Sequence, residues 1–374
     1  MMKDLEYKTC ENCVLDTSVS DIIFDESGVC NYCSSYYEVE KTIPKGDKAK
    51  LELDKIVNSV KRDATKSKYD CIVGISGGVD STYLLYLVKE LGLNPLAVHV
   101  DTGWNSEISV NNVLNLVKKL DVDLFTYVID WSDMRDLQLA FFKASIPDCD
   151  IPQDHVFPAI LHKIAYQKKI KHLISGHNFV TEYIIPKNWS YNSNDYNHII
   201  DINKKFGKAK LKKYPFFKPF QRFVFYKYIY KVYSHRPLYF VNYNKDEITN
   251  FITNQLGWKS YGGKHEESRF TKFFQSYYLF EKFGFDKRKA HLSNLILSKQ
   301  MTKTVALEIL KVHPYNSDWL QRELSYMLRK MGLSEKGWNE IMSEIPRKHT
   351  DFASDENTLL VRTIRYLFKF KNRK

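Results

Sequence analysis

The stretch that decides the fold is Tyr69-Asp70-Cys71-Ile72-Val73-Gly74-Ile75-Ser76-Gly77-Gly78-Val79-Asp80-Ser81-Thr82. Residues 71–75 form a short, mostly β-branched apolar run, which predicts a strand buried on both faces. Residues 76–81 predict a sharp turn, and leucines and a valine at helical spacing predict a helix over residues 82–91. Because a turn and a helix N-terminus direct backbone N–H groups and partial positive charge to one place, we expect an anion there, and phosphate fits best.

The turn itself is the hexamer Ser76-Gly77-Gly78-Val79-Asp80-Ser81. Its two glycines let the backbone approach phosphate oxygens closely. The two serine hydroxyls can donate to the same anion, and Asp80 can brace the loop or help to hold Mg²⁺. The hexamer lacks the G-x-x-x-x-G-K-[ST] pattern of kinase-type loops. It resembles the PP-loop of the ATP pyrophosphatases, which include asparagine, GMP and NAD synthetases and tRNA-thiolating and lysidine-forming enzymes.

That resemblance implies attack by a substrate oxygen on the α-phosphate of ATP, departure of pyrophosphate, and displacement of AMP by a nucleophile such as ammonia or sulfide. It implies ATP and Mg²⁺ as cofactors, with residues 76–81 as the nucleotide-binding set. The alternative is a glycine turn between a strand and a helix that binds no ligand.

Length and composition limit the number of domains and the classes of protein to which this chain can belong. The 374 residues leave room for two or three domains, and 14% aromatic and 27% charged residues are typical of a globular protein. The formal charge of +12 allows an anionic partner, although ordinary solubility of a lysine-rich protein explains it as well. No apolar run approaches the roughly 20 residues that a membrane span needs. Residues 1–6 show no signal-peptide core, so we expect a cytoplasmic protein.

Four of the six cysteines lie in the first 40 residues, as two C-x-x-C pairs. Cys10 and Cys13 form one pair and Cys30 and Cys33 the other, a spacing typical of a four-thiolate zinc ribbon. Residues 22–29 predict a short hairpin between the pairs. Such a closed site leaves no position for a substrate, so we expect structural Zn²⁺. Disulfides and thiol redox chemistry are the alternatives.

Further strands are predicted at residues 96–100, 123–130 and 236–241, and residues 172–178 predict a strand that ends in a small-residue turn. In a parallel sheet, ligands lie beyond the carboxyl ends of the strands, which places Asp101 near the nucleotide, although it could simply help to cap the next helix. The turn at the end of residues 172–178 is Gly176-His177-Asn178, which resembles the second nucleotide-contacting motif of PP-loop enzymes. A plain turn is the alternative there. Residues 216–233 interleave aromatic and basic side chains, for which we prefer a core edge with lysines extending to water over an RNA surface.

The block Tyr261-Gly262-Gly263-Lys264-His265-Glu266-Glu267-Ser268-Arg269 is dense in groups that bind or move protons. Lysine or arginine could neutralise charge at the α-phosphate, and a glutamate or histidine could take a proton from ammonia. We therefore name Lys264, His265, Glu266 and Glu267, with Asp80, as candidate catalytic residues. A solvated charge cluster is the alternative.

Together these motifs resemble the N-acetyl sugar amidotransferases of bacterial surface-polysaccharide biosynthesis. The resemblance covers nearly the whole chain and rests on the paired C-x-x-C, the PP-loop, Gly176-His177-Asn178 with Glu182, Pro186 and Trp189, Trp258 with residues 261–268, and residues 283–288 leading to His291-Leu292-Ser293. It implies that the acetamido group of a carried sugar is adenylylated and that ammonia then gives an acetamidino group, in O-antigen biosynthesis.

The expected fold is α/β: a doubly wound parallel sheet of the PP-loop ATP pyrophosphatase (HUP-like) type. We expect a zinc ribbon at residues 1–42, the PP-loop domain at 43–258 and a helical region at 259–374 that contributes to the substrate site.

The sequence offers no place for a glutaminase. Residue 2 is Met, and neither Cys71 nor Cys149 sits in a Gly-x-Cys-x-Gly elbow. Ammonia should therefore be free or come from a separate glutaminase subunit, for which the family implies the imidazole-glycerol-phosphate-synthase type and the option of a cyclase-like companion. The first rival interpretation is a tRNA-modifying PP-loop enzyme, and the second is a non-catalytic nucleotide-binding module. We favour a sugar substrate over a nucleic-acid partner.

Overall fold

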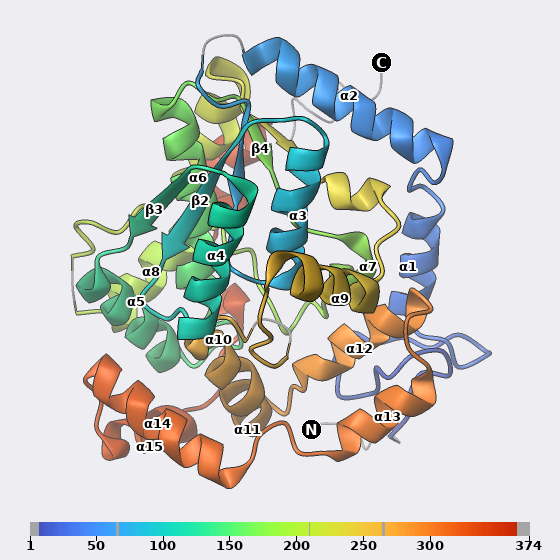
Figure 1. The fold of residues 1–374 in the computed structure, drawn as a ribbon. Coiled ribbons are helices and arrows are strands. Elements are labelled where there is room, and N and C mark those ends of the chain that lie inside the picture. Colours follow the sequence, from blue (N-terminus) through green and yellow to red (C-terminus); the bar gives the residue numbers. More distant parts are fainter. Residues whose placement is uncertain (1–6, 65–66, 209, 264–265, 365–374) are drawn as a thin grey trace.

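The computed structural model describes residues 7–64, 67–208, 210–263 and 266–364. At its centre is a five-stranded, fully parallel sheet in the order β3-β2-β1-β4-β5 (Figure 1). The strands are β1 (Cys71–Gly74), β2 (Pro95–Asp101), β3 (Leu124–Val128), β4 (His172–Ile174) and β5 (Tyr233–His235). The expected doubly wound α/β sheet is therefore confirmed.

Helices cover both faces of the sheet because the central strands are apolar on both sides. The helices α3 (Val79–Glu90), α4 (Glu107–Leu120) and α9 (Lys245–Leu256) pack with Cys71 and Val73 on one face. The helices α5 (Trp131–Ala144) and α6 (Ile151–Gln167) pack with Ile72 and Val98 on the other. All four of these strand residues are at most 1% exposed, so the core lies on both sides of β1 and β2.

The strand order reverses between β1 and β4. The chain runs from β1 outward to β2 and β3, then returns to place β4 on the opposite side of β1. In an open parallel sheet, such a reversal leaves a crevice beyond the carboxyl ends of the two strands, where ligands bind. The segment 75–78 follows β1 and the segment 175–178 follows β4, so both predicted nucleotide motifs lie at this crevice.

The last strand is not where the sequence analysis placed it. Residues 236–241 were expected to form it, but the strand is Tyr233–His235 and a 3₁₀ turn occupies Pro237–Phe240. Proline has no backbone N–H and cannot donate to a neighbouring strand, so the ladder ends before it. The apolar Leu238 that suggested a strand is 1% exposed because it packs against the sheet core from this turn.

The N-terminal segment folds around the cysteines. The bridges Thr9–Asp16 and Phe24–Cys30 make two short antiparallel pairings, the second of which lies within the hairpin expected at residues 22–29. The helices α1 (Asn31–Glu40) and α2 (Asp47–Asp63) follow. Tyr36 of α1 packs on Phe179 of α7 (Phe179–Glu182), with ring centroids 4.5 Å apart, so the cysteine region contacts the loop that follows β4.

After Phe283 the described residues contain helices and no strand, as expected. The region from residue 269 comprises α10 (Arg269–Phe273), a π-helical stretch (Phe274–Tyr278), α11 (Leu279–Phe283), α12 (Lys287–Leu297), α13 (Lys303–Lys311), α14 (Ser317–Met331) and α15 (Glu335–Ser343). The remaining helical segments are α8 (Tyr196–Phe206), a π-helix (Gln221–Ile229) and short 3₁₀ turns at His349–Asp351 and Asp355–Asn357. None of the helices in the described ranges is both long enough and apolar enough to cross a membrane.

Candidate active site

The PP-loop is held in shape by its own serines. The Ser76 N–H donates to the Ser81 Oγ at 3.2 Å, and the Gly78 N–H donates to the Ser76 Oγ at 3.3 Å. The Ser81 hydroxyl in turn donates to the Gly78 carbonyl at 3.2 Å. The loop thus folds back on the first turn of α3, where the helix N-terminus favours negative charge.

Gly77 is required by both conformation and space. Its φ is +83°, and a Cβ at this position would lie 2.4 Å from the Ser109 carbonyl oxygen. The Gly77 carbonyl accepts hydrogen bonds from the Trp258 Nε1 at 2.8 Å and the Asn112 Nδ2 at 3.4 Å. Trp258 therefore fixes the loop from a segment far along the chain, which gives a physical role to a residue singled out from the sequence.

Asp80 points from the first turn of α3 to Tyr243, whose hydroxyl donates to its Oδ1. Gly176 comes close to the same turn: a Cβ on it would lie 3.5 Å from the Asp80 carbonyl carbon and the Ser81 nitrogen. The loop after β4 thus packs directly on the PP-loop helix, as its predicted role beside the nucleotide requires.

The other two residues of the second motif differ in placement. His177 faces the cavity, 3.7 Å from Glu182 and 3.3 Å from the Tyr239 hydroxyl. Asn178 is fully buried, and its Oδ1 caps α7 by accepting from the Thr181 N–H at 2.8 Å. Contact of Asn178 with a nucleotide stays a prediction, while its local role is to start the helix that carries Glu182.

Asp101 serves the turn after β2. Its Oδ1 accepts from the Gly103 N–H at 2.8 Å and from the Asn105 Nδ2 at 3.1 Å. Asn105 also contacts the His99 Nε2 at 3.0 Å, and the His99 Nδ1 lies 2.9 Å from the Ile75 carbonyl. Asp101 therefore positions Asn105 and His99, and it is these two that line the cavity. The sequence analysis missed both because neither belongs to a recognisable motif.

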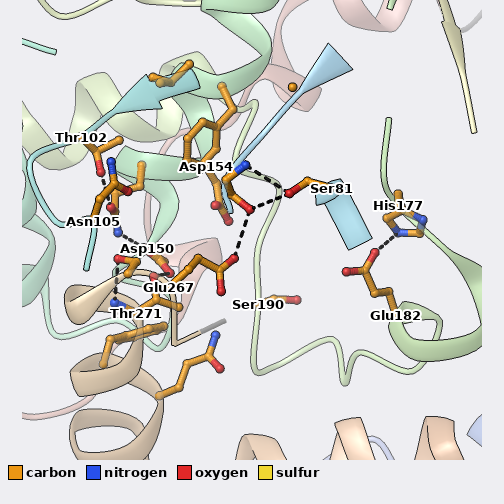
Figure 2. Close-up of a pocket in the computed structure, with 18 of the residues that line it drawn as sticks. Ser81, Thr102, Asn105, Asp150, Asp154, His177, Glu182, Ser190, Glu267 and Thr271 are labelled. Atoms are coloured by element: carbon orange, nitrogen blue, oxygen red, sulfur yellow. Dashed lines mark hydrogen bonds and ion pairs between the residues drawn. The ribbon is translucent and has the colours of Figure 1, made fainter. Parts of the chain in front are cut away.

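The charged block after Trp258 is pinned to the same turn. The Ser106 N–H donates to the Glu267 carbonyl at 2.8 Å, and Asn105 and Ser268 form an antiparallel bridge. The Glu267 Oε1 then accepts from the Ser76 hydroxyl at 3.5 Å. Figure 2 shows the Glu267 carboxylate extending towards Ser81. Glu267 thus reaches the PP-loop, as a catalytic role would require.

Glu266, the other described candidate residue of this block, makes no such contact with the PP-loop serines. The Glu266 Oε2 pairs with the Lys272 Nζ at 2.6 Å, and its carboxylate packs against Gly262 and Gly263. Glu266 therefore braces the glycine turn. Lys264 and His265 lie outside the described residues.

Two cavities meet at the PP-loop. The larger, of about 560 Å³, runs from the ends of β1 and β2 to the starts of α6 and α12. The smaller, of about 260 Å³, lies between Gly78 to Asp80 and Tyr261. The residues lining both are Ser76, Ser81, Thr181, Glu182 and Glu267. A phosphate-bearing ligand at the serines would therefore reach both cavities.

The far end of the larger cavity is acidic. Asp148, Asp150 and Asp154 line it together with Lys287 at the start of α12. Burial, with the Asp148 charge beside it, raises the pKa of Asp150 to about 7. The surrounding protein likewise raises the pKa of Asp154, although its side chain is open to the cavity. The three aspartates lie within seven residues of one another, but Lys287 joins them only in the fold, and the sequence analysis missed the group.

The four N-terminal cysteines fit a tetrahedral metal site. Their sulfurs all lie within 4.8 Å of one another, with Sγ–Sγ distances of 3.7 Å for Cys10–Cys33, 3.8 Å for Cys13–Cys30 and 3.6 Å for Cys30–Cys33. A tetrahedron with metal–sulfur bonds of about 2.3 Å has edges of about 3.8 Å. All four are free thiols in the structure, so it does not support the disulfide alternative.

Sheet and site together define a PP-loop α/β protein. Residues 52–211 match the family model described as NAD synthase, and residues 267–367 match the one described as LPS biosynthesis protein WbpG-like, C-terminal domain. The chain thus combines a PP-loop domain of the NAD-synthase type with a WbpG-like C-terminal domain. This combination is consistent with the WbpG-like amidotransferase family and confirms the predicted resemblance at that level.

Among curated proteins, an uncharacterised protein of Methanocaldococcus jannaschii is 31% identical over 173 residues, which is 45% of this chain and 58% of that protein. The tRNA(Ile)-lysidine synthase of Chlamydia pneumoniae is 49% identical over 41 residues, 11% of this chain and 12% of that protein. The chain thus spans less than two thirds of either relative.

Three solved structures are similar in part. The NMN synthetase of Francisella tularensis is 15% identical with a TM-score of 0.37, over 76% of this chain and 97% of that one. The U34-tRNA thiolase NcsA of Methanococcus maripaludis, solved with its [4Fe-4S] cluster, is 15% identical with a TM-score of 0.33, over 82% and 88%. The NH₃-dependent NAD synthetase of Campylobacter jejuni is 14% identical with a TM-score of 0.32, over 80% and 98%. At these TM-scores nothing about the substrate follows.

We predict that Gly77→Ala destabilises the protein and abolishes its stabilisation by ATP. The positive φ costs about 1–2 kcal/mol for a residue with a Cβ, and the clash with the Ser109 carbonyl adds to it. The matched control is Gly257→Ala, where φ is +70° and nothing lies within 4 Å of the added Cβ. Thermal unfolding with and without ATP measures both effects. Equal losses of stability in the two variants, with ATP binding intact, would contradict the clash.

We predict that Asp150→Asn changes the pH dependence of stability. The folded-state pKa of about 7 exceeds the ordinary value of 3.8, so the wild type should lose stability as pH rises through this window. The variant should lack that loss, with a difference in slope of up to about 1.4 kcal/mol per pH unit. Urea unfolding at several pH values between 4 and 7.5 measures it. Parallel curves for the two proteins would contradict the burial of this carboxyl group.

Proposed function

We propose that this protein is an ATP-dependent amidotransferase that acts on an N-acetylated sugar in surface-polysaccharide biosynthesis. The acetamido oxygen attacks the α-phosphorus of ATP, the bond from that phosphorus to the bridging oxygen breaks, and pyrophosphate leaves with the electron pair. Ammonia adds to the activated carbon, loses one proton and expels AMP, which carries the former amide oxygen. The sugar then bears an acetamidino group.

One observation carries this proposal: the two regions matched by family models meet at one site. Ser76 belongs to the PP-loop of the NAD-synthase-type region, and Glu267 is the first residue of the WbpG-like region. Their side chains share a hydrogen bond and line the same two cavities. The PP-loop supports ATP-dependent adenylylation and C–N bond formation, and the WbpG-like region supports a polysaccharide precursor as the acceptor.

We assign separate roles in this reaction to the PP-loop backbone, to Asp80 and to Glu267. The backbone N–H groups of residues 76–81 would bind the departing diphosphate, and the α3 N-terminus would stabilise its charge. Bound Mg²⁺ would neutralise phosphate charge. The carboxylates of Asp80 and Glu267 line the cavity beside the PP-loop and would hold the ion there. Glu267 lines both cavities, and we assign to it the proton that ammonia loses as it adds to the activated carbon. Lys264 and His265 remain proposed catalytic residues.

Ammonia is proposed to come from a separate glutaminase subunit, with a cyclase-like companion as a further component. Hydrolysis of glutamine by a cysteine needs a reactive, accessible thiol. All six cysteines are buried: four form the N-terminal cluster, and Cys71 and Cys149 are 0% exposed. Burial also raises the pKa of the Cys149 thiol, which opposes thiolate formation.

Structural Zn²⁺ is the proposed occupant of the cysteine cluster. Its sulfur spacing suits one ion shared by four thiolates, whereas a cluster with a different iron on each thiolate would spread the sulfurs further apart. The Lys303 Nζ donates to the Cys10 carbonyl at 2.7 Å, which ties the site to α13. The ion would therefore hold the N-terminal segment against the C-terminal helices.

A tRNA-modifying enzyme is the second candidate, because short matches to tRNA(Ile)-lysidine synthases accompany the basic charge. The buried Cys149 speaks against thiolation chemistry. A gel shift with bulk tRNA separates the candidates, because tight and salt-sensitive binding would favour the tRNA enzyme.

We predict that Ser76→Ala and Asp80→Ala lower pyrophosphate release at least a hundredfold, since each alters the loop that binds the departing group. Asp54→Ala on the exposed face of α2 is the control and should keep the wild-type rate. Pyrophosphate is measured with ATP, ammonium and a panel of UDP-N-acetylhexosamines. Mass spectrometry of the sugars reports the exchange of oxygen for NH. Wild-type rates in both loop variants would refute the assigned roles.

We predict that Cys13→Ser loses one equivalent of zinc and lowers the unfolding temperature by several degrees, because binding to the folded state contributes folding free energy. Cys71→Ser is the matched control, since it removes a buried thiol outside the cluster and should retain the metal. Elemental analysis of the purified proteins reads out the metal. Iron with inorganic sulfide in the wild type, or equal zinc in both variants, would rule out the proposed site.

A further inference from the structure

The far end of the larger cavity has no role in the nucleotide chemistry described so far. One end of the cavity lies beyond β1 and β2, at His99 and the PP-loop serines. The other end is lined by α6, by α12 and by the loop before α6. Asp154, Phe157 and Leu161 of α6 all line it, and their spacing of three and seven residues puts them on one face of that helix.

Two ionisable groups in this region keep their hydrogen-bonding capacity open to the cavity. Within the described residues, neither the Asp154 carboxylate nor the Lys287 ammonium makes a hydrogen bond or an ion pair. Their neighbours differ: Asp148 accepts from the Tyr191 N–H at 2.9 Å, and Asp150 accepts from the Thr271 hydroxyl at 2.9 Å. Asp148 and Asp150 therefore shape the wall, while Asp154 and Lys287 can bind a ligand.

Lys287 is also unfavourably placed for the helix itself. It is the first residue of α12, where the helix dipole favours negative charge. The three aspartates offset that cost, and burial lowers its pKa. The aspartates therefore account for a lysine at this position, and its ammonium still lines the cavity, where it can donate to a ligand.

The same end of the cavity exposes apolar surface. Phe157 is 37% exposed and Ile185 is 47% exposed, and both line the cavity. An aromatic face beside a carboxylate and an ammonium suits a ligand with an apolar face and hydroxyl groups around its edge, since one group accepts and the other donates hydrogen bonds. A pyranose ring has this form.

Charge decides which part of the acceptor fits. Lys287 faces three aspartates at this end of the cavity, so this end offers phosphate groups no excess of positive charge. The neutral ring can enter, whereas any diphosphate carrier must stay outside. The acetamido group on the ring would then point along the cavity towards Glu267 and the PP-loop serines, which line the same cavity.

We propose that Asp154 and Lys287 bind the hydroxyl groups of the acceptor sugar ring and that Phe157 packs on its face, so that these three residues determine acceptor specificity. This inference rests on the proposed function, whose acceptor site it locates.

The test is binding of three probes, UDP-N-acetylglucosamine, UDP-N-acetylgalactosamine and free N-acetylglucosamine, in the presence of a non-hydrolysable ATP analogue. Ligand-observed NMR and calorimetry follow the full chain and the variants Asp154→Asn, Lys287→Gln and Phe157→Ala. Asp154→Asn keeps shape and removes charge at a cavity-facing position, so it should fold normally. The controls are Asp54→Asn and Lys336→Gln, at exposed positions on other helices.

We expect at least one probe to bind the wild type, and each of the three variants to bind it about tenfold more weakly or worse. Affinity for the ATP analogue should stay within twofold, and Phe157→Tyr should restore sugar binding. In turnover with a reactive sugar, KM should rise more than kcat falls.

Unchanged sugar affinity in Asp154→Asn and Phe157→Ala would overturn the inference. So would the absence of binding by all three probes to a wild type that binds the ATP analogue. Failure of the proposed function looks different, because no N-acetylated sugar would then yield an amidino product, whether or not a probe binds. Amidine formation with unchanged KM in the variants would refute the sugar subsite and leave the proposed function standing.

Discussion

The contact on which this site depends is the attachment of residues 267–269 to the turn after β2. The Ser106 N–H donates to the Glu267 carbonyl and the Arg269 N–H donates to the Trp104 carbonyl. These backbone bonds do not depend on side-chain chemistry, yet they fix where the Glu267 carboxylate lies. The C-terminal helices are held separately, because Phe270, Phe273 and Phe274 pack in the same core as α5 and α6.

Several features reinforce this arrangement from a distance. Trp258 donates to the Gly77 carbonyl and stabilises the loop from the other side. The cysteine region packs on α7 through Tyr36 and Phe179, and α7 follows the motif that contacts the PP-loop helix. The N-terminal cluster thus supports the site without facing it. A structural metal there would influence activity through the position of α7 and not through chemistry.

The fold was largely predictable because its signals are local. The β-branched run at residues 71–75 forms β1, and the two C-x-x-C pairs gather into one cluster. The turn predicted at residues 76–81 is shorter than expected, because α3 already begins at Val79. The last strand was misplaced because its apolar residues pack from a 3₁₀ turn that begins at Pro237. The site was only partly predictable. Glu267 was found through its charged block, but Asp154 and Lys287 are 133 positions apart in the chain and meet only in the folded protein.

The central claim is that an amide oxygen of the acceptor becomes bonded to the α-phosphorus of ATP. The most direct measurement uses an acceptor sugar whose acetamido oxygen is ¹⁸O, incubated with ATP, ammonium and the enzyme. Our account predicts that the ¹⁸O appears in AMP and that pyrophosphate contains none. An amidino product accompanied by unlabelled AMP, or label found in phosphate or pyrophosphate, would contradict it.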